Sequence, residues 1–217
     1  GGLWVDYDLD GFLDLYLSDN NTVSENRLFR NMGNNTFELI EFDDQTTGST
    51  FAAIPIYADN NDYPDIYVTN DFNENNELHI NLDGNQLTEN AYGYNLVDPF
   101  DGMGLATSDF NNDGSVEVFI ANRSENGFYT KGNNGLYSNI AEFTGIYDTG
   151  WAWGASFADF NHDLFDDVYI TTGLNAPEED HYFENQAIND IRVYSEITLQ
   201  SDPIFTEGGT VVSFDYD

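Results

Sequence analysis

The stretch that decides the fold is residues 6–17, DYDLDGFLDLYL, in which acidic side chains recur at alternate positions and an apolar run follows. The same pattern returns at residues 57–68 (YADNNDYPDIYV), 109–120 (DFNNDGSVEVFI) and 159–170 (DFNHDLFDDVYI). The copies start at intervals of about 50 residues, a period typical of solenoids, propellers and arrays. Residues 208–217, GGTVVSFDYD, match the start of a fifth copy that is cut off after two acidic positions. The chain is therefore expected to consist of structural repeats.

Between the acidic segments lie short alternating stretches separated by Asn and Gly, which favour strands and turns. In the first repeat this pattern predicts four strands, at about Leu3–Val5, Leu13–Leu17, Arg27–Asn31 and Thr36–Glu41, and no helix is expected. Four short antiparallel strands per repeat are typical of a propeller blade. A β-sandwich also contains short strands, but it would not repeat an acidic loop at a fixed spacing. We therefore predict an all-β fold, a β-propeller built from four-stranded antiparallel blades.

We expect residues 1–217 to form a single propeller segment with about four blades, as part of a larger ring. The repeats are expected to begin near residues 1, 51, 102 and 152, with a truncated repeat at 208–217. Small residues are frequent in Gly102–Ala106 and Gly150–Ala155, so these segments are expected to be innermost strands, where there is little room. The alternation of Ile, Val and Tyr at 189–199 predicts an enlarged outer hairpin in the fourth blade.

Each acidic loop carries side-chain oxygens at several of the loop positions 1, 3, 5 and 9, while position 7 offers a backbone carbonyl. Oxygen donors of this kind are the ligands that Ca²⁺ prefers. The pattern begins like an EF-hand loop, but the last acid stands at position 9 instead of 12 and strands are expected on both sides. The predicted metal ligands, including two in the truncated copy, are Asp6, Asp8, Asp10, Phe12, Asp14, Asp59, Asn61, Tyr63, Asp65, Asp109, Asn111, Asp113, Ser115, Glu117, Asp159, Asn161, Asp163, Phe165, Asp167, Asp215 and Asp217.

The four loops are not equivalent as metal sites. A single D-x-D-x-D segment is often a solvated turn, since Asp and Asn bond to their own backbone, but four copies at one spacing favour metal binding. The first loop has four carboxylates and a Gly, so it is expected to bind most tightly. The third and fourth loops carry Asn111 and Asn161 at position 3 and should still bind, although Leu164 replaces the Gly of the fourth. The second loop has Tyr57 at position 1 and Asp62 in place of Gly, so we expect three to four Ca²⁺ ions with the second site weakest.

The composition narrows the classes of partner. The chain has 40 Asp and Glu against 5 Lys and Arg, a formal net charge of −35. Such an excess of one sign repels itself in a compact state, so bound cations are expected to offset part of it. Five cationic side chains cannot supply the basic surface that nucleic-acid binding requires. There is no cysteine, which excludes disulfides and thiolate sites. No apolar run is long enough for a membrane span, and no signal peptide is recognised.

A resemblance to a known family adds to this interpretation. The acidic loops, the run at 26–37 (NRLFRNMGNNTF) and the segment at 150–159 (GWAWGASFAD) together resemble FG-GAP/VCBS-type propeller repeats. The resemblance is closest to cartilage acidic protein-like bacterial proteins and extends to integrin alpha subunits. It implies a β-propeller with one Ca²⁺ loop in each blade that carries the motif, on secreted or surface-exposed proteins. Ligand roles carry over only where side chains match, which leaves Tyr57, Asp62 and Leu164 outside the pattern.

The function favoured by these features is that of an extracellular, calcium-binding recognition, adhesion or scaffold module. Its partner would be a protein or glycan ligand at a propeller face, or a cell-surface assembly. The expected affinity for calcium is on the order of 10⁻⁴ to 10⁻³ M, as in extracellular modules. Tyr92, Tyr94 and Trp151 are the aromatic residues that could stack on sugars, although core or strand packing is the more common role of such residues.

Two other classes of function stay open. One is a polysaccharide-active lyase or hydrolase that uses the propeller as a scaffold, with acid and base groups drawn from carboxylates or from His79, His162 and His181. We expect these histidines to be structural or surface residues, and no spacing of nucleophile and base is recognised, so no enzymatic activity is predicted. The other is a structural subunit of an extracellular assembly, held by its blade edges or faces.

Overall fold

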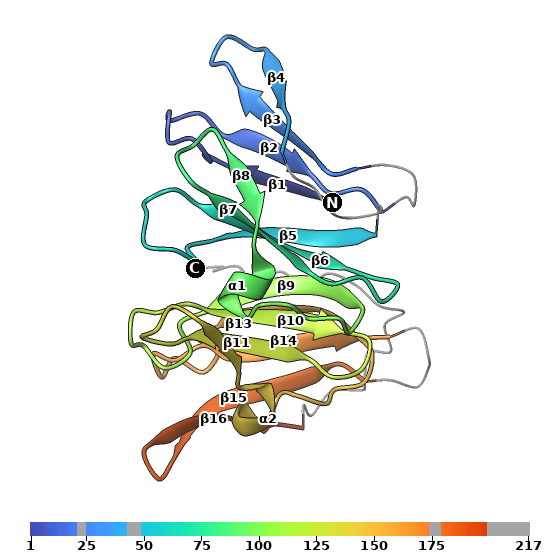
Figure 1. The fold of residues 1–217 in the computed structure, drawn as a ribbon. Coiled ribbons are helices and arrows are strands. Elements are labelled where there is room, and N and C mark those ends of the chain that lie inside the picture. Colours follow the sequence, from blue (N-terminus) through green and yellow to red (C-terminus); the bar gives the residue numbers. More distant parts are fainter. Residues whose placement is uncertain (21–24, 43–48, 174–178, 199–217) are drawn as a thin grey trace. The chain divides into compact units, whose positions relative to one another are not determined.

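The computed structural model describes residues 1–20, 25–42, 49–173 and 179–198, and these contain sixteen strands and two short helices (Figure 1). The strands form four sheets of four antiparallel strands, and each sheet uses four strands that are consecutive in the sequence. Sheets of this kind, in which neighbours in sequence pair in space, are propeller blades. The predicted all-β fold, built from four-stranded antiparallel blades, is therefore confirmed.

The first blade closely follows the expected pattern. Its strands are β1 (Gly2–Val5), β2 (Asp14–Leu17), β3 (Arg27–Asn31) and β4 (Phe37–Ile40). All four strands begin and end within one residue of their predicted bounds. The side chains of β2 alternate between buried and half-buried, as expected for a strand whose two faces differ in burial.

The other three blades repeat this order. The second consists of β5 (Thr50–Ile56), β6 (Asp65–Asn70), β7 (Glu77–Asn81) and β8 (Leu87–Glu89). The third consists of β9 (Gly102–Ser108), β10 (Glu117–Asn122), β11 (Gly127–Lys131) and β12 (Tyr137–Asn139). The fourth consists of β13 (Ala152–Ala158), β14 (Asp167–Thr172), β15 (His181–Ile188) and β16 (Ile191–Glu196).

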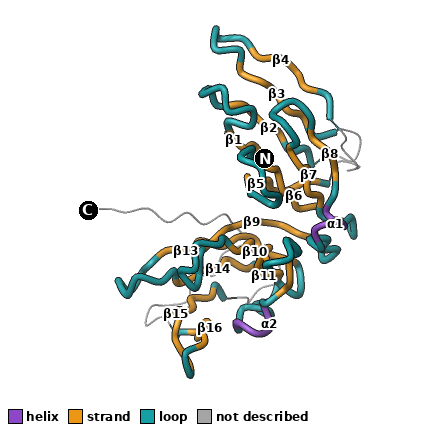
Figure 2. The backbone as a smooth tube through the Cα atoms, turned by 60° about the vertical axis from the view of Figure 1, so that its left-hand side comes forward, coloured by secondary structure: helices purple, strands orange, loops and turns teal. Residues whose placement is uncertain are grey.

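The expectation of no helix is wrong at two places. Helices α1 (Ala91–Tyr94) and α2 (Ala141–Thr144) follow the last strands of the second and third blades (Figure 2). Each is a single turn that ends at a residue in the left-handed conformation, Asn95 with φ 57° and Gly145 with φ 90°. A four-residue turn is too short for an apolar periodicity to announce it. No helix in the described ranges is long and apolar enough to cross a membrane.

The chain divides into two compact units, each with two blades. The first comprises residues 1–101 and 133–136, and the second comprises 102–132 and 137–217. In the first unit, buried side chains of blade one face buried side chains of blade two across an apolar core. This core contains Val5, Tyr7, Tyr16, Leu28, Ile66, Val68 and Leu87.

The core of the second unit is mainly aromatic. Phe128 of the third blade stacks on Phe157 of the fourth, with ring centroids 5.8 Å apart and an angle of 11° between the planes. Phe119 meets the same Phe157 edge-on at 5.8 Å, and Tyr194 lies 6.1 Å from Phe128. Large rings bury much apolar area per residue, which lets two thin blades form a stable interface.

The small residues of the first strands have a packing role. In the second unit, β9 and β13 lie close together, and a Cβ built on Gly104 would lie 2.5 Å from the backbone oxygen of Trp153. Only glycine allows the two backbones to come this near. The enlarged hairpin of the fourth blade is also confirmed, since β15 and β16 extend to a turn at Asn189 and Asp190, both with positive φ.

Candidate metal centre

The acidic loops occupy the same place in all four blades. Each joins the first strand of its blade to the second, as in the connection from β1 to β2 or from β13 to β14. In each blade the acid at loop position 9 is the first residue of the second strand, at Asp14, Asp65, Glu117 and Asp167. The loop is thus a strand connection within a blade, as predicted.

A shared set of short hydrogen bonds shapes these loops. In all four, the side chain at position 3 accepts from the backbone N–H at position 5, and the side chain at position 5 accepts from position 7. In the first loop Asp8 accepts from Asp10 at 3.2 Å, and Asp10 accepts from Phe12 at 2.9 Å. The same pairs in the other loops span 2.7 to 3.0 Å. Asp and Asn favour such turns because their short side chains reach the backbone two residues ahead.

Position 1 closes the loop where it is acidic. Asp6, Asp109 and Asp159 each accept from the N–H of loop position 6, at 3.1, 2.9 and 2.9 Å. The donor of the fourth loop is Leu164, which adopts φ 75° where Gly11 of the first loop has φ 92°. The replacement of Gly by Leu therefore keeps the shape of the loop at the cost of a strained backbone. The second loop has Tyr57 at position 1 and lacks this bond.

The acid at position 9 is buried and anchored to the blade. Asp14 accepts from the N–H of Tyr7 at 3.1 Å and from the N–H of Asn31 on β3 at 2.7 Å. Asp65 makes the equivalent bonds to Ala58 and Asn81 at 2.7 and 2.8 Å. Burial raises the pKa of both carboxyl groups above the usual range, although the backbone donors counteract this.

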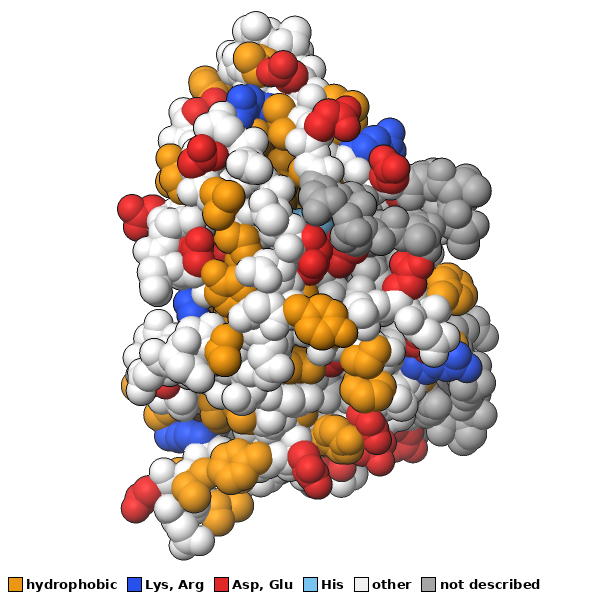
Figure 3. All heavy atoms as spheres, viewed as in Figure 1, with side chains coloured by type: hydrophobic (Ala, Val, Ile, Leu, Met, Phe, Trp, Pro, Cys, Tyr) orange, Lys and Arg blue, Asp and Glu red, His pale blue; other side chains and the backbone are white. Residues whose placement is uncertain are grey.

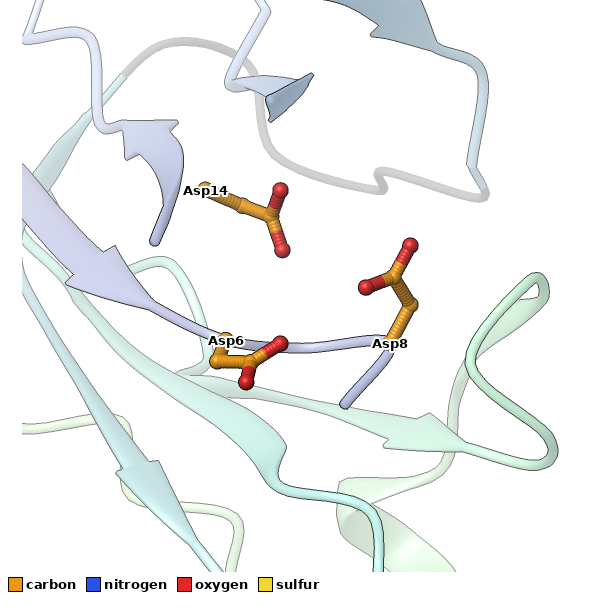
Figure 4. A group of neighbouring side chains, drawn as sticks. All are labelled: Asp6, Asp8 and Asp14. Atoms are coloured by element: carbon orange, nitrogen blue, oxygen red, sulfur yellow. The ribbon is translucent and has the colours of Figure 1, made fainter. Parts of the chain in front are cut away.

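Three carboxylates converge in the first loop. One oxygen each from Asp6, Asp8 and Asp14 lies within 4.8 Å of the others, and Figure 4 shows the three groups around a common space. In the described part of the chain, no other group of three Asp, Glu, His or Cys side chains comes together in this way. The Oδ1 atom of Asp6 is buried without a hydrogen-bond partner. A buried carboxylate oxygen with no donor beside two further carboxylates suits a hard cation such as Ca²⁺.

The second loop is filled by one of its own amide groups. The Nδ2 atom of Asn61 donates to Asp59 Oδ2 at 2.8 Å and to the backbone oxygen of Asn81 at 2.7 Å. Two oxygens of the loop region are thus engaged by an amide instead of facing a free space. With Tyr57 at position 1, the residues fit a metal ion less well than those of the first loop.

In the third and fourth loops, the acid at position 9 also accepts a hydrogen bond from a side-chain hydroxyl group. Glu117 is buried, accepts from Thr130 Oγ1 at 2.9 Å, and has a pKa raised to about 7, mainly by burial. Asp167 accepts from the Tyr182 hydroxyl at 3.1 Å and from the N–H of Asn185 at 2.9 Å, and burial raises its pKa too. In these loops the donors Asn111 and Asn161 stand in place of one carboxylate. Asp215 and Asp217 lie outside the described residues.

Replacement of Glu117 by Gln is expected to stabilise the calcium-free protein at high pH only. Because the folded-state pKa lies near 7 and that of an unfolded Glu near 4.5, stability is lost as the pH rises between these values. Gln cannot ionise, so at pH 8 in chelator E117Q should melt about 3–8 °C above the wild type. At pH 4, the two proteins should melt at the same temperature. Scanning calorimetry at both pH values measures this, with the exposed Glu38→Gln as a control. An equal difference at both pH values would contradict the assignment.

The sequence did not reveal the asparagines on the third strands. Asn81 of β7 donates from Nδ2 to the backbone oxygen of Tyr7, in the acidic loop of the neighbouring blade, at 2.7 Å. Asn185 of β15 makes the same bond to Phe110, also at 2.7 Å, within the second unit. Asn31 occupies the equivalent register on β3. The available sequence signal was that Asn recurs two residues after Phe29, His79 and Phe183, which lie at the same position of the third strands.

The geometry of loop, strand and repeat is that of a known repeat type. Residues 109–170 match the family model of the FG-GAP-like repeat. The matched FG-GAP-like segment begins at position 1 of the third loop and ends in β14, so it spans two acidic loops. It supports the predicted relationship to FG-GAP repeats and to propeller-type modules. No curated protein matches the chain significantly.

The histidines and aromatic residues take different places. His79 is fully buried and burial lowers its pKa to about 4, so it is a neutral core residue, whereas His162 is exposed. His181 lies half-buried, 2.7 Å from Glu196. Tyr92 is 79% exposed, which corrects the expectation that it packs in the core, while Trp151 is half-buried and stacks on Trp153.

Acidic side chains are common on the surface of the described residues. Figure 3 shows many Asp and Glu side chains and few Lys and Arg on the face that it presents. The first unit also contains a cavity of about 320 Å³, lined mainly by Asn and Glu residues, beside the start of β7 and helix α1. Its lining includes Asn73, Asn76, Glu77, Glu89 and Tyr92.

Proposed function

We propose that this chain is a calcium-binding β-propeller module of an extracellular protein, with a recognition, adhesion or scaffold role and no catalytic activity of its own. The convergence of Asp6, Asp8 and Asp14 around a buried, unpartnered carboxylate oxygen is the observation that carries the proposal. The same loop structure recurs in the other three blades, which extends the proposal to their loops. The finer resemblance to cartilage acidic protein-like proteins stays a prediction.

Three loops are proposed to bind Ca²⁺ well. The first would use its carboxylates, and the third and fourth would add Asn111 and Asn161 to their acids. The second loop is proposed to bind a fourth ion weakly or not at all, because Tyr57 replaces the acid at position 1 and the Asn61 amide bonds to both Asp59 and the backbone oxygen of Asn81. Bound Ca²⁺ supplies positive charge to loops that otherwise repel themselves, so it stabilises the blades instead of taking part in a reaction.

The surroundings of the sites favour an extracellular setting. Ligand sets with neutral Asn donors have dissociation constants on the order of 10⁻⁴ to 10⁻³ M, which only a calcium-rich medium saturates. A net charge of −35 also keeps such a protein soluble where salt screens the repulsion. We propose secretion or cell-surface exposure on this basis.

The cavity of the first unit is the surface proposed to meet a ligand. Its amide and carboxylate groups can hydrogen-bond to hydroxyl groups, and the exposed ring of Tyr92 can stack on a sugar face. A glycan, free or on a glycoprotein, is the ligand class with this combination of groups. The partner is therefore proposed to be a glycan or a glycosylated cell-surface protein.

Titration calorimetry with CaCl₂ on the chelator-treated protein tests the metal sites. We expect about three ions to bind with dissociation constants of about 0.1–1 mM. Asp6→Asn should lose one ion, because it removes charge from the convergent cluster. Asp62→Asn, which removes the same charge from an exposed position in the second loop, should lose none. No binding by the wild type at 10 mM calcium, or the same loss in both variants, would refute the proposal.

A further inference from the structure

Arg30 places a permanent positive charge at the first acidic loop. Its Nε atom lies 2.8 Å from Asp8 Oδ2, and the two side chains are only 21% and 12% exposed. Its guanidinium also lies 5.5 Å from the ring of Tyr7, in the same loop. Asp8 belongs to the convergent carboxylate cluster, so an internal cation contacts the group that the proposed Ca²⁺ would bind.

The same guanidinium fastens the loop to the next blade. Its NH2 group donates to the backbone oxygen of Gly84 at 3.0 Å and to Asn85 Oδ1 at 3.2 Å, both in the turn between β7 and β8. That turn is packed tightly on the loop, since a Cβ on Gly84 would lie 3.0 Å from Asp8 Cα and 2.8 Å from the Tyr63 ring. Arg30 therefore joins three groups from two blades within the first unit.

The guanidinium suits this position for reasons of charge and shape. Like charges on Asp6, Asp8, Asp10 and Asp14 repel one another when no ion is bound, and a cation at Asp8 offsets part of this repulsion. A planar guanidinium with several donors can pair with a carboxylate and hydrogen-bond to two further acceptors at once, which a lysine ammonium on its flexible stem does less well. When Ca²⁺ is present, the same positive charge repels it.

We propose that Arg30 is a built-in counter-ion of the first loop, which holds the loop and the β7–β8 turn together without metal and weakens calcium binding there. The effect of Arg30 on calcium binding rests on the proposed function, whereas its role in holding the β7–β8 turn does not. Arg30 makes the first loop, which has the most carboxylates, less dependent on metal for its structure than its acidic composition indicates.

The test compares Arg30→Gln, Arg30→Lys and the control Arg27→Gln, which removes the same charge from an exposed position on the same strand. To isolate the first loop, all are made in a background with Asp109→Asn and Asp159→Asn, since Asn keeps the acceptor that closes each loop. Calcium affinity is measured by titration calorimetry. Hydrogen exchange of the backbone amides of 82–86 is measured in chelator, with the Gly84 amide as the main reporter.

We expect Arg30→Gln to bind calcium about three- to tenfold more tightly, since a nearby like charge is gone. In chelator its turn amides should exchange about tenfold faster than those of the wild type. Arg30→Lys should return the calcium affinity toward the wild-type value without restoring the protection of the turn. Arg27→Gln should change neither quantity.

Unchanged or weaker calcium binding by Arg30→Gln would overturn the counter-ion role. Unchanged exchange of the turn in chelator would overturn the role in fastening the two blades. If no variant and no wild-type protein binds calcium, the proposed function fails together with the counter-ion role for calcium. The exchange measurement in chelator still decides the second role, so the two failures are distinguishable.

Discussion

Removal of calcium is expected to lower the midpoint of thermal unfolding by about 10–20 °C. At 5 mM free calcium, a site with a dissociation constant of 0.1–1 mM adds about 1–2 kcal/mol to the free energy of unfolding. Three such sites add about 3–7 kcal/mol, and 1 kcal/mol corresponds to about 2–4 °C in a chain of this length. Differential scanning calorimetry with 5 mM CaCl₂ or excess chelator measures the difference.

Two controls make the calcium result specific. Magnesium at the same concentration should restore little of the lost stability, because Mg²⁺ requires tighter octahedral geometry and gives up its water reluctantly. Sodium chloride of equal ionic strength separates general screening of the acidic surface from site binding. If either salt restored the full difference, the stabilisation would be non-specific and the loops would be ordinary solvated turns.

Replacement of Asn81 by Ala is expected to reduce the free energy of unfolding by about 3–5 kcal/mol. The Asn81 side chain is fully buried and donates to the backbone oxygens of Tyr7 and Pro64 at 2.7 and 3.1 Å. It also accepts from the N–H of Gly84 at 2.8 Å. Alanine leaves these three backbone groups without that partner inside the protein, which costs more than the loss of the bonds themselves. Denaturant unfolding of both proteins in calcium measures the effect.

Asn31→Ala is the matched control for this substitution. Asn31 stands at the same register of its blade, but its side chain is half-exposed and its bonds go to Leu13 and Gly33 at 3.1 Å each. Water can replace these partners, so a loss of only about 0.5–1 kcal/mol is expected. Equal losses in the two variants would show that the contact of Asn81 with the neighbouring loop contributes nothing special.

The part of the fold that the sequence predicts is the part governed by local pattern. Residues 13–17 combine an apolar alternation with an acidic loop before them, and the structure places β2 there. The enlarged hairpin ending at Asn189 and Asp190 follows from the same alternation. Short-range chemistry also accounts for the turns within the loops, because their hydrogen bonds link residues two to five positions apart.

The features that sequence reasoning missed depend on the neighbouring blade. Arg30 is an ordinary surface charge until the turn at Gly84 and Asn85 packs beside it. In the sequence, Asn81 is one of many Asn residues and nothing marks it as buried. Only its hydrogen bond to the backbone oxygen of Tyr7, in another repeat, explains why it is buried. Contacts between residues more than 50 positions apart carry no periodic signal along the chain.

In every blade, the backbone N–H groups at loop positions 5 and 7 donate to the side chains two residues earlier. This holds also in the second blade, where position 1 is Tyr57 instead of an acid. The loop is therefore shaped by its own Asp and Asn side chains, and the proposed ion would be an addition to it. A repeat of this kind could therefore gain or lose a proposed metal site through one or two substitutions and still join its strands correctly. If the proposed calcium sites exist, the number of ions can differ from the number of blades, and the need for calcium can change during evolution one blade at a time.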